Sequence, residues 1–288
     1  MPCASGIAHC RFCLPHCCAN GFQKLYCSQV GLVNISENAT IDPSANLEDN
    51  VTVGPYTTIG PGVKIGEGTV IGPNVLIDNG AVIGKNCKIY HGASLGGDPQ
   101  IVGFKDIQSF VHIGNDTTIR EYVTIQRSGK ENGVTKIGDH CMLMNYVHVA
   151  HDCEIGNHVI VVNSTGLSGH IVVEDYAFIS GFVAVHQYVR IGAHSMIQGM
   201  SGISQDVLPY ALVGGWPAKL VSLNSVGLRR RDFSPQVRTT IKSAFKILKN
   251  SELNTTQAIQ KIESEIEMSD QIRNLIDFVR NSKRGFSK

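Results

Sequence analysis

An aliphatic residue recurs at every sixth position through most of the chain, and this period restricts the folds that the chain can adopt. The series runs over residues 35–95, resumes in phase over 113–125 and continues over 137–203. A glycine often follows the aliphatic residue, as in Ile59-Gly60, and a small residue stands four positions after it. One phase held over so many units marks a repeat architecture.

A repeat of six residues is too short for a pair of helices and is typical of a parallel β-helix, in which short strands alternate with turns. The aliphatic and small positions would fill the interior, with glycine and asparagine in the turns. Three units close one coil, so residues 35–208 predict about ten coils and a solenoid roughly 45 Å long. We predict a mainly β fold with the β-helix over residues 34–228.

Three cysteines follow this pattern. Cys87, Cys141 and Cys153 each stand at the small inward position, four residues after an aliphatic one. Free cysteine behaves as a small buried hydrophobe. We therefore interpret all three as core residues and not as ligands.

Two segments interrupt the repeat. Residues 96–112 and 126–136 do not follow the six-residue phase and are predicted to leave the coils as loops. Loops on a rigid scaffold often carry binding residues.

The repeat ends after Pro209, and helix signals follow. Ser234-Pro235, Asn254 and Ser269-Asp270 each place an N-cap side chain ahead of apolar residues at helical spacing. We predict a C-terminal helical domain over 229–288 that covers the open end of the solenoid. Residues 230–288 hold 12 Lys or Arg against 7 Asp or Glu, so this cap is also a predicted dock for an acidic partner.

The first 36 residues contain no Asp or Glu and hold six of the nine cysteines. A lack of acidic residues ahead of a regular domain favours an organelle-targeting presequence. Residues 1–33 are therefore predicted to be a leader, either a transit peptide or a disordered segment. The alternative is a zinc cluster, although its spacing matches no standard finger; it would use His9, Cys10, Cys13, His16 and Cys17.

The overall composition excludes two partner classes. A net charge of +1 gives no general field that would attract nucleic acid. No apolar run reaches the ~18–20 residues that a membrane-spanning helix needs, so stable membrane insertion is not expected.

Four histidines avoid the inward positions. His148 directly precedes inward Val149, and His151 follows it by two residues. His170 and His186 also stand outside the interior phase. A histidine satisfied within the core is therefore a poor interpretation of any of the four.

Coil stacking places three outward positions in one column. Gln187 follows His151 by 36 residues, which is two coils, and Gly169 stands midway. At ~4.8 Å per coil, His151 and Gln187 lie about 10 Å apart, a span that one sugar-sized ligand can bridge. Spacing alone does not distinguish such a site from an inert polar stripe.

At these residues the chain resembles a known family. MNYVHVAHDCEIGN, STGLSGH, AVHQYVRIGAH, SVGLRRRDFS and the closing NSKRGFSK are similar, in order and spacing, to stretches of the UDP-N-acetylglucosamine O-acyltransferases, the first enzymes of lipid A synthesis. The resemblance covers roughly residues 35–288. It implies a left-handed parallel β-helix with a C-terminal α-helical cap, assembled as a homotrimer with active sites in the clefts between subunits.

The resemblance also implies a reaction, in which an (R)-3-hydroxyacyl group moves from acyl carrier protein to the 3-hydroxyl of UDP-N-acetylglucosamine. His151 matches the general base, because a neutral imidazole can accept the hydroxyl proton. Asp152 matches the residue that orients this base. The backbone N–H of Gly169 matches the group that faces the oxyanion.

Further positions match substrate contacts of the family. Those near the sugar and phosphates are Gln100, His148, His170, His186 and Gln187. Those near the nucleotide are Asn224, Arg230 and Arg231, and guanidinium groups suit phosphate. Gly199 matches the position that limits acyl length, and glycine there leaves room for a long chain.

Three departures from the family pattern stand near these positions. Ile101 replaces a carboxylate near the sugar, so preference at the sugar 3-position is open. Trp216-Pro217 replaces Asn-His near the acyl tail, and Val226 replaces an acidic residue near the nucleotide. The base and the oxyanion glycine are retained.

Other hexapeptide proteins supply the alternatives. A γ-type carbonic anhydrase needs three histidines converging on zinc, with a pair spaced more widely than His148 and His151. A coenzyme-A-dependent acetyltransferase would not explain the basic cap. A structural solenoid without catalysis would account for the missing carboxylate at Ile101. We expect no metal and no cofactor, with the carrier thioester as co-substrate, and a mitochondrial location, or a cytoplasmic one if the protein is bacterial.

Overall fold

The computed structural model describes residues 33–78, 80–250 and 252–288. The predicted leader and its alternative zinc ligands lie outside the described residues, apart from Val33, which is buried at the first coil.

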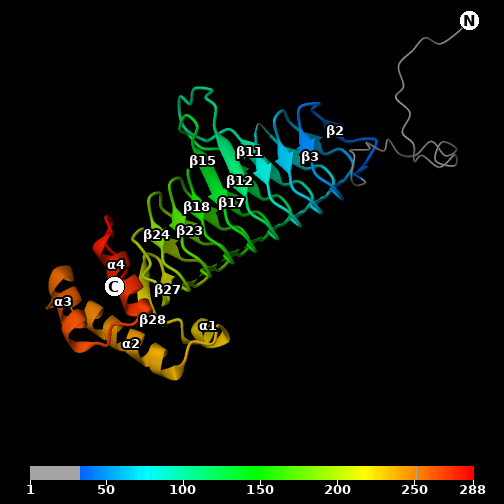
Figure 1. Ribbon diagram of the computed structural model, residues 1–288. Coiled ribbons are helices and arrows are strands. Elements are labelled where there is room, and N and C mark those ends of the chain that lie inside the picture. The colour runs from blue at the N-terminus through cyan, green and yellow to red at the C-terminus, as the bar shows by residue number, and fades with distance from the viewer. Residues whose placement is uncertain (1–32, 79, 251) are drawn as a thin grey trace, which may run out of the picture.

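The chain winds into a solenoid with three sheets along its sides (Figure 1). Sheet I has 11 strands: β1 (Asn34–Ile35), β4 (Thr52–Val53), β7 (Val70–Ile71), β10 (Lys88–Ile89), β13 (Thr118–Ile119), β16 (Met142–Leu143), β19 (Ile160–Val161), β22 (Phe178–Ile179), β25 (Met196–Ile197), β27 (Ala211–Gly215) and β28 (Ala218–Leu223). Sheet II has nine: β2 (Thr40–Ile41), β5 (Thr58–Ile59), β8 (Leu76–Ile77), β11 (Ser94–Gly97), β14 (Thr124–Gln126), β17 (His148–Val149), β20 (Gly166–Leu167), β23 (Ala184–Val185) and β26 (Gly202–Ile203). Sheet III has eight: β3 (Asn46–Leu47), β6 (Lys64–Ile65), β9 (Val82–Ile83), β12 (Phe110–Ile113), β15 (Val134–Ile137), β18 (Glu154–Ile155), β21 (Val172–Val173) and β24 (Arg190–Ile191).

All strand pairs along the sides are parallel, and only the β27–β28 pair is antiparallel among the described strands. We call the corners at which the chain passes between sheets edge I–II, edge II–III and edge III–I. Residues 144–147, 150–153 and 156–159, for example, form one turn on each of these edges in that order.

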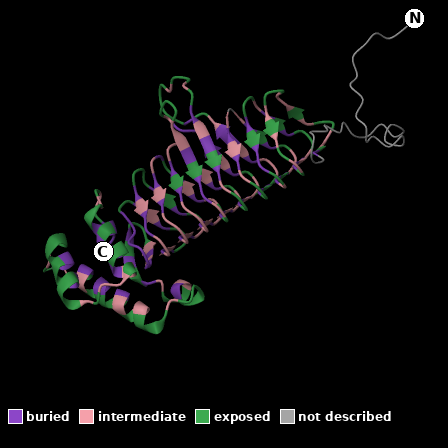
Figure 2. Ribbon diagram, viewed as in Figure 1, coloured by how far each residue is buried: buried purple, intermediate pink, exposed green. Residues whose placement is uncertain are grey.

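The interior is filled by the aliphatic positions of the repeat, as predicted. From Val53 to Ile203 these residues are at most 3% exposed, and Figure 2 shows buried residues recurring along the coils of this stretch. Cys87, Cys141 and Cys153 are buried and free, which confirms their assignment to the core. Burial raises the pKa of Cys141 to about 11 and that of Cys153 to about 12, so both thiols stay protonated.

The turns contain more than the glycine and asparagine predicted for them. The third residue after the aliphatic position has a positive φ, and in many coils it is aromatic or histidine, as at Tyr146, His170 and Tyr188. This left-handed conformation costs an L-residue roughly 1–2 kcal/mol. Rings at this position stack between successive coils, as His170 does on Tyr188 at 4.5 Å, and such contacts offset part of the cost.

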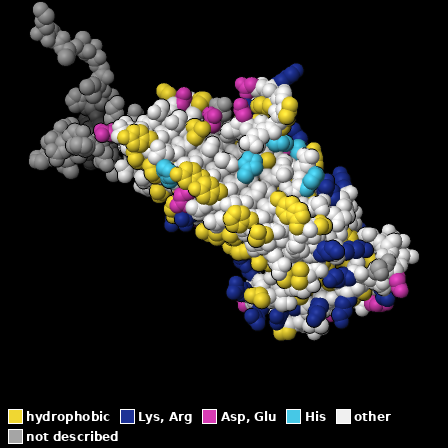
Figure 3. All heavy atoms as spheres, turned by 180° about the vertical axis from the view of Figure 1, so that it is seen from behind, with side chains coloured by type: hydrophobic (Ala, Val, Ile, Leu, Met, Phe, Trp, Pro, Cys, Tyr) yellow, Lys and Arg dark blue, Asp and Glu magenta, His cyan; other side chains and the backbone are white. Residues whose placement is uncertain are grey.

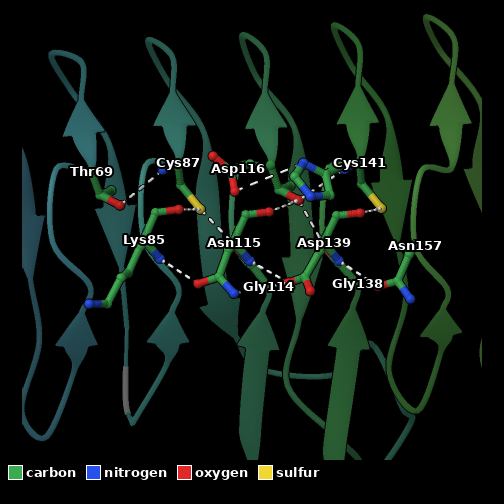
Figure 4. A network of polar contacts seen from close by, with 12 residues as sticks. Thr69, Lys85, Cys87, Gly114, Asn115, Asp116, Gly138, Asp139, Cys141 and Asn157 are labelled. Atoms are coloured by element: carbon green, nitrogen blue, oxygen red, sulfur yellow. Dashed lines mark hydrogen bonds and ion pairs between the residues drawn. The ribbon is translucent and has the colours of Figure 1, made fainter.

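A ladder of side-chain oxygens runs along edge III–I (Figure 4). Asp139 Oδ1 accepts a hydrogen bond from the backbone N–H of Asn115 at 2.6 Å. Asn157 Oδ1 accepts from the N–H of Asp139 at 2.9 Å, and Asp175 Oδ1 accepts from that of Asn157 at 2.7 Å. These turn amides would otherwise lack a partner, so the ladder fixes the turns of this edge.

The two predicted loops are shorter than the sequence suggested. They span 98–109 and 127–133, because β11 and β14 extend to Gly97 and Gln126 while β12 and β15 begin at Phe110 and Val134. The cause is mutual pairing, such as that of Phe110 with Val134, which the repeat does not reveal. Both loops leave the solenoid at edge II–III.

The C-terminal boundary also differs from the prediction. The β27–β28 hairpin follows the last coil, and α1 (Ser225–Arg230) begins before the predicted start of the helical domain at residue 229. The predicted helix starts are confirmed by α2 (Pro235–Lys249), α3 (Thr255–Glu265) and α4 (Asp270–Arg280), which are capped by Ser234, Asn254 and Ser269. Within the described parts of the chain, no helix combines the length and apolarity needed to cross a membrane.

Candidate active site

His151 lies on edge II–III, where the chain turns from β17 to β18. Its side chain is 14% exposed. Asp152 takes the left-handed turn position with a φ of 60°, and its Oδ2 lies 2.7 Å from His151 Nδ1. A hydrogen bond at Nδ1 leaves Nε2 as the ring nitrogen available to a substrate.

Asp152 has more hydrogen-bond donors than the sequence suggested. The hydroxyl of Ser128 donates to Oδ1 at 2.5 Å, and the N–H of Gly129 donates to Oδ2 at 3.3 Å. The hydroxyl of Thr135 accepts the backbone N–H of Asp152 at 2.8 Å. Burial raises the pKa of Asp152, but the bonds from Ser128, His151 and Gly129 outweigh burial and hold that pKa below its usual value. The carboxylate is therefore ionised at neutral pH.

Gly169 lies one coil further along, against the ring of His151. A Cβ on Gly169 would stand 2.7 Å from Cε1 and 2.9 Å from Nε2 of His151. The imidazole thus occupies the space of a side chain, which is a reason for glycine that the sequence did not indicate. The Gly169 N–H finds no acceptor within the described parts of the chain, so this amide remains available to a ligand.

His170 completes a polar cluster on the same edge. Its ring meets that of His151 edge-on at 5.1 Å, and its Nε2 lies 3.7 Å from Asp152 Oδ2. Burial lowers the pKa of His170, against an opposing effect of the Asp152 charge, so the ring is neutral at pH 7. Ligand atoms of His151, Asp152 and His170 lie within 4.8 Å of one another, a spacing that could hold a metal ion; the expected lack of a metal stays a prediction.

The other predicted pocket residues follow the same edge. His148 on β17 bonds to the hydroxyl of Thr124 through Nδ1 at 2.7 Å. Burial, together with the nearby His151, lowers the pKa of His148. His186 and Gln187 are exposed, and His186 Nδ1 lies 3.0 Å from the Gln187 carbonyl oxygen.

Gln100 and Ile101 lie on the loop 98–109. Gln100 is exposed, and its backbone N–H donates to Gln126 Oε1 at 3.2 Å. Ile101 Cδ1 lies 2.6 Å from the point that a Cβ on Gly129 would occupy, and His151 Nδ1 lies 3.5 Å from the same point. An apolar side chain therefore stands near the histidine, where the resemblance predicts a carboxylate.

The predicted nucleotide contacts lie at edge III–I. Asn224 caps α1, and its Nδ2 donates to the carbonyl oxygen of His194 at 2.9 Å. The guanidinium carbon of Arg231 lies 4.2 Å from the ring centroid of Tyr176. Arg230 ends α1 and is exposed. His194 and Tyr176 both belong to turns from sheet III to sheet I.

Gly199 lies on the third edge, I–II, and is exposed. Trp216 is 72% exposed and lies over Gly202, where an added Cβ would meet its ring at 2.8 Å. Exposed hydrophobic side chains also follow edge I–II: Tyr56 at 66%, Tyr122 at 44%, Tyr146 at 60%, Phe182 at 65% and Met200 at 76%. Figure 3 shows one face on which hydrophobic side chains form a row along the solenoid.

A single chain therefore brings together only part of the predicted site. His151, Asp152, Gly169 and His170 are in contact, with His148 beside them. The nucleotide group around Arg231 and the acyl group around Gly199 stand on the other two edges.

Known proteins match both the repeats and the C-terminal part of this chain. The family model described as Udp N-acetylglucosamine O-acyltransferase, Domain 2, matches residues 206–287, and the model described as Bacterial transferase hexapeptide (six repeats) matches 33–66, 62–97 and 135–169. The acyl-[acyl-carrier-protein]–UDP-N-acetylglucosamine O-acyltransferase of Aquifex aeolicus is 49% identical over 191 residues, which are 66% of this chain and 73% of that protein. The chain belongs to the UDP-N-acetylglucosamine O-acyltransferase family.

Solved structures of the family extend the likeness into the helical cap. A UDP-N-acetylglucosamine acyltransferase from Bacteroides fragilis superposes with a TM-score of 0.85 at 40% identity, covering 88% of this chain and 99% of that one. The Arabidopsis UDP-N-acetylglucosamine acyltransferase gives a TM-score of 0.77 at 32% identity, with 88% and 100% covered.

Several residues that contact the predicted site were missed by the sequence analysis. Tyr188 and Tyr176 could have been found, because each stands 18 residues from a histidine on which it stacks, His170 and His194 respectively. Ser128 lies in a loop outside the repeat, so no sequence spacing indicated its contact with Asp152.

Gly169→Ala is expected to push the His151 ring away from Asp152, because its Cβ would overlap the imidazole. A displacement of about 1 Å can lower a catalytic rate roughly 10²-fold. Crystal structures and acyl-transfer rates would be compared with those of Gly166→Ala, a control whose added Cβ meets no atom within 4 Å. An unmoved ring in Gly169→Ala would contradict this account.

Proposed function

We propose that this chain transfers an (R)-3-hydroxyacyl group from acyl carrier protein to the 3-hydroxyl of UDP-N-acetylglucosamine, the first step of lipid A synthesis. The curated relatives are named for acyl transfer from acyl carrier protein to UDP-N-acetylglucosamine. The observation that carries the proposal for this chain is the hydrogen-bonded pair of His151 and Asp152. The Nε2 atom of His151 lies next to the backbone of Gly169.

In the proposed mechanism His151 is the general base. Its Nε2 takes the proton of the sugar 3-hydroxyl while the oxygen attacks the thioester carbonyl carbon. Asp152, ionised at neutral pH, stabilises the imidazolium that forms. The carbonyl oxygen becomes an oxyanion that the N–H of Gly169 would stabilise. When the C–S bond breaks, the carrier thiolate takes the proton from His151 and leaves as a thiol.

The remaining residues of edge II–III suit a neutral sugar. His148 and His170 are neutral at pH 7, since burial lowers the pKa of both rings, and can therefore donate or accept hydrogen bonds. His186, Gln187 and Gln100 extend the polar surface. The proposed reaction needs no metal or cofactor, because the thioester already activates the acyl group.

We propose that the working form is a homotrimer. The three groups of site residues stand on separate edges of one solenoid, so only a neighbouring copy can bring a second edge to His151. The exposed hydrophobic residues of edge I–II, including Tyr146 and Phe182, support this proposal, because a row of this kind commonly marks an interface. The acyl chain would then run along the neighbour's edge I–II towards Gly199, while Asn224, Arg230 and Arg231 would hold the nucleotide.

The helical cap is the proposed dock for the acyl carrier protein. Figure 3 shows Lys and Arg side chains gathered at this end of the molecule, and a cationic surface would attract an acidic carrier. For the location we propose the mitochondrion, on the acid-free composition of residues 1–36 alone, with the cytoplasm as the alternative in a bacterium.

His151→Ala is expected to lower the transfer rate roughly 10²–10⁴-fold, because the base is lost. The assay uses labelled UDP-N-acetylglucosamine with a panel of 3-hydroxyacyl carriers, so it also reads chain length. His140→Asn, a histidine change on edge III–I that keeps a turn-compatible residue, serves as control. If no acyl carrier serves as a donor, the result would favour the structural solenoid. Turnover of acetyl-CoA would favour the acetyltransferase.

The trimer predicts a particle of three chains of 31.2 kDa each in light scattering. Phe182→Asp should dissociate it, because a carboxylate buried in an apolar interface lacks a partner. A wild-type monomer at micromolar concentration would contradict the proposal.

Reversing charge in Lys242→Glu/Lys246→Glu is expected to raise KM for the acyl carrier about tenfold at low salt and less at high salt, where charges are screened. Lys249 is left unchanged, since its Nζ donates to the carbonyl oxygen of Leu220 at 3.0 Å. Lys88→Glu on sheet I is the control. Equal KM values for both variants at low salt would remove the cap from this role.

A further inference from the structure

Residues 127–129 connect the loop 98–109 to the carboxylate of Asp152; we call this tripeptide the strap. Arg127 is 2% exposed and Ser128 is 0% exposed, although both stand at the start of a loop. Neither residue follows the six-residue repeat, and the reaction above assigns no part to either.

Arg127 ties the strap to the loop. Its guanidinium donates to Asp98 Oδ1 at 2.8 and 3.0 Å and to Asp106 Oδ1 at 2.7 Å. It also bonds the carbonyl oxygen of Ile107, and its central carbon lies 5.1 Å from the ring centroid of Phe104. Charge-assisted bonds of this kind are strong and directional, so the strap and the loop form one hydrogen-bonded unit.

The hydroxyl of Ser128 is bonded on both sides. It donates to Asp152 Oδ1 at 2.5 Å and accepts the backbone N–H of Lys130 at 3.0 Å. The Ser128 carbonyl oxygen accepts the hydroxyl of Ser109 at 2.6 Å. A Cβ on Gly133 would stand 2.1 Å from Ser128 Oγ, so the chain leaves that space to the hydroxyl. Ser128 therefore has one orientation, and it points at Asp152.

The carboxylate of Asp152 has two histidine neighbours. Oδ2 lies 2.7 Å from His151 Nδ1 and 3.7 Å from His170 Nε2. Rotation about the Cβ–Cγ bond would change which ring Oδ2 faces. The buried bond from Ser128 to Oδ1 opposes this rotation, and burial strengthens such a bond.

We infer that Ser128 is a positioning residue for the proposed base: its hydroxyl sets the plane of the Asp152 carboxylate so that Oδ2 faces Nδ1 of His151. His151 then carries its proton on Nδ1 and presents the lone pair of Nε2. Ser128 touches no substrate and acts through Asp152 alone. This inference rests on the proposed function, and it gives the base and the loop that carries Gln100 one common support.

The test compares three variants of the full chain. Ser128→Ala removes the donor, and Ser128→Thr keeps it. Ser109→Ala is the matched control, because it removes a buried hydroxyl that bonds the strap without touching Asp152. Ser128→Cys, which keeps the side-chain volume and weakens the donor, replaces the alanine variant if that variant does not fold.

The first measurement is the tautomer of His151, read from imidazole 15N resonances in histidine-labelled protein without substrate. His151→Gln identifies the signal. Titratable groups around the site include His148, His170, Lys130 and Cys153, so spectra are taken at about pH 8, where unperturbed imidazole is neutral. The second measurement is kcat and KM for both substrates.

Ser128→Ala is expected to convert a single Nδ1-protonated His151 into a mixture of tautomers. It should lower kcat about 10-fold, the lower end of the loss seen when outer hydrogen bonds to metal-binding histidines are removed, with KM within about twofold. Ser128→Thr and Ser109→Ala should keep the wild-type tautomer and kcat.

A single unchanged tautomer in Ser128→Ala would overturn the inference. An equal loss of kcat in Ser109→Ala would also overturn it, since the strap would then act only through general stability. If the wild-type chain transfers no acyl group, the proposed function fails, and the tautomer comparison still decides whether Ser128 orients the pair.

Discussion

The contact between aliphatic side chains of successive coils determines where every polar group of this chain stands. Val149 pairs with Leu167, one coil apart and both fully buried. Because their positions are fixed, the residues two places after each, His151 and Gly169, are fixed against one another as well. A slip of two residues would place the imidazole at an inward position of the repeat. The relative position of His151 and Gly169 is therefore a property of the core.

The same repeat position has different chemistry on different edges. On edge III–I it holds Asn115, Asp139, Asn157 and Asp175, whose side chains pair with the turn amides of the neighbouring coils. On edge II–III it holds His151, Gly169 and Gln187, and the ladder is interrupted. The cost of this interruption is that the Gly169 amide has no partner among the residues that the structure describes. The benefit is a donor and a ring that face outwards, which suits a reaction that develops charge on a carbonyl oxygen. One edge thus serves stability, and another is left free for chemistry.

Period and capping chemistry were sufficient to predict the interior, the buried cysteines and the starts of the three long helices, because each depends on residues close in sequence. The column of His151, Gly169 and Gln187 was also predictable, since stacking follows from the period. Ser128 was not, because its contact with Asp152 depends on how a loop folds back. The lengths of β12 and β15 were missed for the same reason, as their extra residues pair only with each other. The reason for glycine at 169 required the position of a ring that spacing alone does not give.

Both loops leave and rejoin the solenoid at one corner without disturbing the pairing of later strands. Length can therefore vary at 98–109 and 127–133 while all downstream coils keep their orientation. Removing one six-residue unit from a coil would instead rotate the rest of the solenoid by a third of a turn, and His170 would face a different side from His151. Evolution of this scaffold can consequently change the length of its loops without moving the coils. The number of coils can change only in whole turns, because a change of one third of a turn would separate His151 from His170.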